Sequence, residues 1–244
     1  MRLHLSVFLK KFFSTKSCVG YLLDLVIIVF GITISFWLQS RYNTSENLRK
    51  QKGAYERILA DLELDRTYLE LAFANNQSQV IAAQEIIRGA INEDNFNHII
   101  HYYGTFFNDN TINSIRSTGL LEDFANKKLI NELLTYYRQN YDFLTHAARF
   151  DEQIAMENIL HVASTIQIDS VSIKDHILHQ NKSKTARFGI NERTKSDLIN
   201  NEKFIGLLNS KVWIKSAYNN SIERAIEKNL SLATAIENEL KFFE

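Results

Sequence analysis

The longest nearly continuous run of apolar residues lies close to the N-terminus, over residues 19–38. A run of this kind has the length that one helix needs to cross a bilayer, roughly 20 residues. It ends at Phe36-Trp37-Leu38 without the small residues that mark the cleavage site of a signal peptide. The pattern therefore predicts an uncleaved transmembrane helix over residues 19–40.

Past this segment, apolar residues recur at alternating steps of three and four, which is the spacing of amphipathic helices. The stripes predict one long helix from Asn43 to about Ala90, a shorter aromatic helix over 95–107, a bent helix from Lys127 to about Thr165 and a last long helix over Glu202–Phe243. Helices whose stripes face one another pack around a shared core. We therefore expect an antiparallel bundle of long helices.

Individual positions refine this outline. Asp65 interrupts the stripe of the first long helix, which favours an intramolecular bundle over an extended two-stranded coiled coil. Asn126 is expected to cap the helix that follows it. Residues 108–113, rich in Asn, predict a loop, and residues 168–201, rich in Ser, Lys and Asn, predict an irregular segment with short helical turns.

The composition agrees with a helical fold. The 244 residues include no proline and only eight glycines, so the strongest helix breaker is absent and the tight turns of an all-β fold are hard to build. We therefore predict an all-α protein in three parts: a tail over residues 1–18, the transmembrane helix over 19–40 and a helical bundle domain over 41–244.

The distribution of charge bears on orientation and partners. Arg2, Lys10, Lys11 and Lys16 precede the apolar run with no acidic residue before Asp24, which predicts a cytoplasmic N-terminus and a periplasmic or otherwise extracytoplasmic main domain at a bacterial inner membrane. The tail is interpreted either as an amphipathic helix in the headgroup zone or as an ordinary basic flank. The 28 basic and 28 acidic residues balance, which argues against a nucleic-acid partner.

One face of the predicted transmembrane helix is a candidate helix–helix interface. Asp24, Ile28, Gly31 and Ser35 recur at steps of three and four, and small residues at such positions let two helices approach closely. We predict that this stripe pairs with a second copy of the chain or with another membrane protein whose cation meets Asp24. In the alternative interpretation, Asp24 lies at the bilayer boundary and reaches the headgroups.

No pattern for catalysis or for a cofactor rises above chance. His98 and His101, and likewise His176 and His179, have the spacing of paired metal ligands, but no third ligand is evident nearby. We therefore predict no metal site, no cofactor and no enzymatic activity. The aromatic residues of the bundle, which include Tyr136, Tyr137, Tyr141 and Phe143, are assigned to core packing, with a pocket for a small ligand or peptide as the alternative.

Three stretches together resemble a known family. Asp24 precedes the Gly31-Ile pair by seven positions, residues 55–65 repeat Leu and Asp, and the Gly-Leu turn at 117–121 is followed by the pair Tyr136-Tyr137. These features resemble the short bacterial membrane proteins grouped as domain of unknown function 6090. The resemblance covers roughly the first 140 residues. It implies a membrane anchor and a helical domain, and no established activity.

The sequence thus predicts a protein held at the lipid bilayer that acts through other proteins. Our leading expectation is a membrane-anchored helical scaffold or accessory subunit that mediates protein–protein interaction or oligomerisation. The alternative is a periplasmic sensory bundle that binds a small ligand and signals through its membrane helix, in which case the output must pass through a partner because the tail is short.

Overall fold

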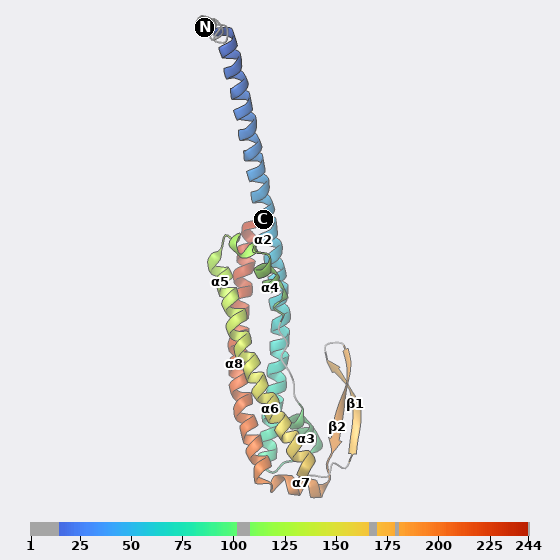
Figure 1. The fold of residues 1–244 in the computed structure, drawn as a ribbon. Helices are drawn as coiled ribbons and strands as arrows, with labels where there is room; N and C mark the ends of the chain where they lie inside the picture. Colours follow the sequence, from blue (N-terminus) through green and yellow to red (C-terminus); the bar gives the residue numbers. More distant parts are fainter. Residues whose placement is uncertain (1–14, 102–107, 166–169, 179–180, 244) are drawn as a thin grey trace, which may run out of the picture. The chain divides into compact units, whose positions relative to one another are not determined.

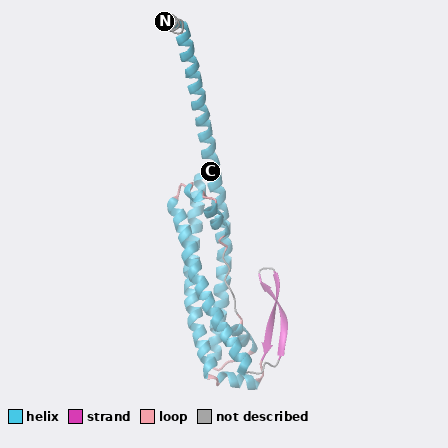
Figure 2. Ribbon diagram, in the orientation of Figure 1, coloured by secondary structure: helices cyan, strands magenta, loops and turns pink. Residues whose placement is uncertain are grey.

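The computed structural model describes residues 15–101, 108–165, 170–178 and 181–243, in which helices joined by short turns and loops are accompanied by one β-hairpin (Figures 1 and 2). The predicted all-α class with one apolar N-terminal helix is confirmed. The helices are α2 (Thr15–Ile87), α3 (Glu93–Ile100), α4 (Asn110–Ser117), α5 (Lys127–Thr135), α6 (Tyr141–Thr165), α7 (Glu192–Ile199) and α8 (Glu202–Leu240).

The chain divides into two units, residues 1–53 and residues 54–244, and α2 contributes to both. In the first unit, the large apolar side chains between Tyr21 and Leu38 are 42–72% exposed. This part of α2 is long and apolar enough to cross a membrane, and no other helix among the described residues meets that test. The described residues therefore contain one candidate membrane span, where the hydrophobic pattern predicts it.

The second unit is built from three long helical stretches, which are residues 54–87 of α2, α5 followed by α6, and α8 (Figure 1). Residues 54–62 of α2, together with residues of α5 and of late α8, share one apolar cluster that includes Leu62, Leu133 and Ile236. Residues of late α2, of late α6 and of early α8 share another. It follows that α8 runs antiparallel to both other stretches, which are parallel to each other.

Asparagine side chains begin four of these helices. Asn126 accepts a hydrogen bond from the Leu129 N–H, which confirms the predicted cap of α5. Asn92, Asn191 and Asn201 cap α3, α7 and α8 in the same way. Because the first N–H groups of a helix have no intrahelical acceptor, such caps help to fix where each helix starts.

The helix predicted from Lys127 to about Thr165, for which a bend is expected, is interrupted by a π-helical turn, η2 (Tyr136–Asn140), which joins α5 to α6. A π turn carries one residue more than the α-helical turn it replaces. Two consecutive tyrosines, Tyr136 and Tyr137, are both buried there, and Tyr141 packs against them. The extra residue is what lets this short stretch point so many aromatic rings inward.

Three local predictions were wrong. Residues 108–113 are not a continuous loop, because α4 begins at Asn110, and the Asp61 side chain accepts a hydrogen bond from the Thr111 N–H in its first turn. The aromatic helix ends earlier than expected, since α3 stops at Ile100, and residues 102–107 lie outside the described part of the chain.

The third correction concerns residues 168–201, which we expected to be irregular. The structure places an antiparallel hairpin there, β1 (Ser170–Leu178) with β2 (Asn181–Gly189), followed by α7. Alternating apolar residues such as Val171 and Ile173 fit a strand rather than a turn. The hairpin is fastened to α3, because the Asn97 side chain exchanges two hydrogen bonds of 2.9 Å with the backbone of Phe188.

Candidate functional site

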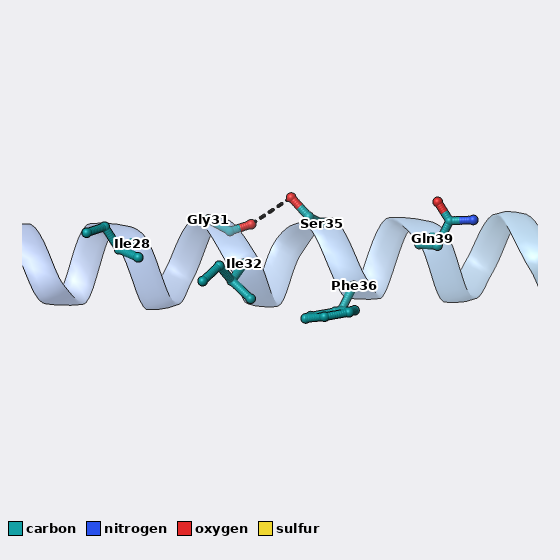
Figure 3. A pocket seen from close by; sticks show the side chains of 6 residues that line it. All are labelled: Ile28, Gly31, Ile32, Ser35, Phe36 and Gln39. Carbon is teal, nitrogen blue, oxygen red and sulfur yellow. Dashed lines mark hydrogen bonds between the residues drawn. The ribbon is translucent and has the colours of Figure 1, made fainter.

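The predicted membrane stripe lies along α2 of the first unit (Figure 3). Ile28, Gly31 and Ser35 line an open groove on the helix surface, together with Ile32, Phe36 and Gln39. Asp24 is not among the lining residues. The Ser35 hydroxyl donates to the Gly31 carbonyl over 2.8 Å, and a Cβ placed on Gly31 would meet nothing within 4 Å. The face is open, and its pairing with another helix stays a prediction.

The second unit carries a different apolar surface, between α6 and α8, which we call the α6/α8 groove. It has a volume of about 330 Å³. Its lining residues are Phe143, His146, Ala147, Phe150, Trp213, Ile214, Ala217 and Tyr218. Three large rings stand at its rim with high exposure: Phe143 at 58%, Phe150 at 62% and Trp213 at 73%.

The helical repeat explains why these rings face outward. Core positions on α6 are taken by Leu144 and Asp151, both buried. Phe143 and Phe150 each precede a core position by one residue, so a turn of about 100° per residue carries them onto the outer surface. The assignment of Phe143 to the core was therefore wrong. Contiguous patches of exposed apolar side chains often mark interaction surfaces, whereas single exposed apolar residues are common on any protein.

Within the second unit, the interior alternates between apolar and polar layers. Three clusters of buried apolar residues are found in the described part of the chain, around Leu62, around Leu69 and around Ile86 of α2. A polar layer lies between each neighbouring pair of clusters. Both layers occupy positions of the core stripe, where apolar residues are the rule.

The first of these, the Asp65 layer, is centred on a fully buried carboxylate. Asp65 accepts hydrogen bonds of 2.6 Å from the Tyr141 hydroxyl and from the Asn108 N–H. The amide of Asn229 donates to the Leu62 carbonyl and to the Tyr136 hydroxyl. Burial raises the pKa of Asp65 to about 6, while the hydrogen bonds from Tyr141 and Asn108 lower it in part.

The second, which we call the lysine layer, draws on all three long stretches. Its members are Asn76 and Gln79 of α2, Asp151 and Asn158 of α6, and Lys211 and Lys215 of α8, each at most 1% exposed. Lys215 Nζ lies 2.5 Å from the Asp151 carboxylate and donates to the Asn76 amide oxygen over 2.6 Å. Lys211 Nζ donates to the Ile99 carbonyl over 2.7 Å.

Burial also shifts the titration of this layer. It lowers the pKa of Lys211 to about 8, with the Asp151 carboxylate opposing that shift and the Lys215 ammonium adding to it. Burial lowers the pKa of Lys215 as well, against the attraction of Asp151. Several atoms have no hydrogen-bond partner among the described residues, including both polar atoms of the Asn158 amide and the Asp151 Oδ1.

The histidine pairs do not assemble a metal centre in the described residues, where no group of three or more His, Cys, Asp or Glu could hold an ion. His98 is exposed, and the His101 ring contacts the Asn97 carbonyl. The side chains of His176 and His179 lie outside the part of the chain that is described.

Sequence reasoning found neither the α6/α8 groove nor the lysine layer. The signal was present, because Phe204, Leu208, Lys211, Lys215, Tyr218 and Ile222 continue one uninterrupted pattern of four- and three-residue steps. Reading that pattern through the two lysines places both of them in the core. The predicted stripe of the last helix instead passes through the neighbouring apolar residue Val212, which is only half-buried.

Comparison of the chain with models of known protein families found no match, and neither did comparisons with curated proteins or with solved structures. The resemblance to domain of unknown function 6090 therefore stays a prediction.

Proposed function

We propose that this protein is a non-enzymatic, membrane-anchored helical scaffold or accessory subunit whose bundle domain binds another protein through the α6/α8 groove. The exposed aromatic rim of that groove is the observation that carries the proposal. Interface cores are enriched in aromatic side chains, and a few such residues supply most of the binding free energy. The candidate span of α2 supports anchoring in the lipid bilayer.

In this proposal the anchor crosses a bacterial inner membrane with the N-terminus in the cytoplasm and residues 54–244 outside it. The cationic residues before the span and the lack of any acid ahead of Asp24 support that orientation. A reporter enzyme that is active only in the cytoplasm, fused at the C-terminus, is expected to be silent. An active fusion would show that the C-terminal domain lies in the cytoplasm and would contradict the proposed orientation.

The docking role is tested by purifying the full-length chain in mild detergent and identifying the proteins that remain bound by mass spectrometry. Trp213→Asp and Phe150→Asp should each reduce recovery of the partner by about tenfold or more, as expected when an aromatic hot spot is lost. Leu230→Asp is the matched control, because Leu230 is also an exposed apolar residue of α8, at 45%, but does not line the groove. Equal recovery of the partner from all variants would show that the groove does not take part in partner binding.

A second candidate function, a sensory bundle that binds a small polar ligand, is favoured by one observation. The lysine layer holds buried polar atoms without partners in the described residues, and such atoms are rare in native interiors unless water or an ion meets them. A ligand that binds there should raise the melting temperature of the wild type. The same ligand should leave the melting temperature of the Asn158→Leu variant unchanged.

A further inference from the structure

We propose that the occupant of the α6/α8 groove is a second copy of this chain, related to the first by a two-fold axis. The inference rests on the proposed function, since it names the partner that the groove binds. Three features of the described residues carry it: the shape of the groove, the charges at its rim and its area.

The groove is lined by both large rings and small side chains. Phe143, Phe150 and Trp213 project from it. The small side chains of Ala147 and Ala217 lie between them, Ala147 four residues after Phe143 and Ala217 four residues after Trp213. A two-fold contact requires one patch to be complementary to itself. Here the rings of one copy can rest on the alanines of the other.

The charges at the rim allow a copy to approach. The exposed residues of α6 beside the groove include both Asp142 and Arg149, one heptad apart. A rim of a single sign would repel a second copy, because like charges would meet across a two-fold axis. The mixed rim carries no such penalty, and the groove lining itself holds no carboxylate, lysine or arginine.

The area fits a pair that is also held by its anchors. The three rings expose roughly 300–500 Å² in each copy, given their exposed fractions and the 150–250 Å² that an aromatic side chain buries. Two copies together would bury roughly 600–1,000 Å² of aromatic surface, less than the ~1,200–2,000 Å² of a stable soluble complex. Confinement to one membrane raises the effective concentration and compensates for the smaller contact.

Disulfide trapping in native membranes tests this arrangement on the full chain. With Cys18, the single cysteine, replaced by Ser, a His146→Cys substitution places a thiol in the groove. Oxidation is expected to give several-fold more covalent dimer than Glu56→Cys, an exposed position on α2. Adding Trp213→Asp should lower the dimer yield of His146→Cys about tenfold or more, and Leu230→Asp should leave it unchanged.

Fluorescence gives a second readout that does not depend on cysteine geometry. Trp37→Phe leaves Trp213 as the single tryptophan. Its emission should shift to shorter wavelength as the protein-to-lipid ratio in vesicles is raised, because the second copy removes the indole from water. Phe150→Asp should abolish that shift.

The inference is overturned if His146→Cys traps no more dimer than Glu56→Cys, or if Trp213→Asp leaves trapping intact. The fate of the proposed function is read separately, from the purification experiment. A different protein that is lost from Trp213→Asp but kept by Leu230→Asp would preserve the docking role and replace the second copy as occupant. If Trp213→Asp lowers neither the yield of trapped dimer nor the recovery of any other protein, both the second copy as occupant and the docking role of the groove are ruled out.

Discussion

The two polar layers of the bundle each hold a buried carboxylate, but they surround it with different partners. Asp65 and Asp151 are both carboxylates in the core, with 0% and 1% exposure. Asp65 is held by neutral donors, a hydroxyl and a backbone N–H, whereas Asp151 faces the ammonium of Lys215. Burial raises the pKa of Asp65, and the hydrogen bonds from its neutral donors offset that rise only in part. An ion pair instead balances one buried charge against the other, at the expense of desolvating two ions.

The comparison teaches that a core position is defined by the helical repeat rather than by hydrophobicity. Both layers continue the stripe of three- and four-residue steps, and each lies between apolar clusters that fix the helices on either side. The surrounding apolar contacts hold the polar groups in place. The following substitutions separate the two layers.

The largest effect is expected from breaking the ion pair. Lys215→Met leaves the Asp151 carboxylate buried without its cation, which should lower the free energy of unfolding by about 3–5 kcal/mol. The double variant Lys215→Met/Asp151→Leu should recover most of that loss, since it removes both charges. Urea denaturation of the full chain in detergent, followed by circular dichroism, measures both. A double variant as unstable as the single one would contradict this account.

The lysine layer should also make stability rise with pH in the alkaline range. The pKa of Lys211 is about 8 in the folded state, below its ordinary 10.5, so the unfolded state binds more protons between these values. Stability relative to Lys211→Met should therefore increase from pH 8 to 10.5, by about 3 kcal/mol at 1.36 kcal/mol per pKa unit. Parallel unfolding curves for the two proteins across this range would show that Lys211 is not buried as described.

The Asp65 layer should show the opposite slope in the acidic range. Its folded pKa of about 6 lies above the ordinary 3.8, so the folded state binds more protons between these values. Stability relative to Asp65→Asn should fall as pH rises from 4 to 6 and then level off, a change of about 3 kcal/mol or somewhat less. Denaturation midpoints of the two proteins at several pH values provide the measurement, and a constant difference would argue against burial of the charge.

The smallest effect on folding is expected at the groove. Trp213→Ser removes a ring that is 73% exposed and should change the free energy of unfolding by less than about 0.5 kcal/mol. The same substitution should abolish disulfide trapping of the dimer. If it destabilises the fold as strongly as Lys215→Met, the ring belongs to the core and the groove is not a docking surface.

Sequence reasoning succeeded where residue type and helical position agree. Tyr55, Ile58, Leu62 and Leu69 of the predicted α2 stripe are buried, the cap at Asn126 is present, and the last helix begins at Glu202 as expected. Local sequence carries this information, because apolar spacing and cap chemistry act over a few residues.

It failed where polar residues hold core positions. In late α2 the predicted apolar stripe runs through Phe73 and Val80, which are only half-buried, whereas Asn76 and Gln79 hold the buried positions. The partner of a buried lysine lies far away in sequence, as Asp151 does for Lys215, and single-sequence periodicity cannot supply that pairing. The hairpin was missed for a related reason, since its attachment depends on Asn97 of a distant helix.

The π turn between α5 and α6 makes the length of the segment over residues 136–140 matter more than its composition. Deleting one residue, Gln139 for example, would leave as many residues as an ordinary α-helical turn holds, because the π turn carries one more. The flanking helices would then keep nearly the same rotation about their axes, and Asp151 would stay beside Lys215. The directions of Tyr136 and Tyr137, both buried in the π turn, would change instead. A shortened segment would therefore disturb the aromatic interior next to Asp65 while leaving the outer face of α6 in place.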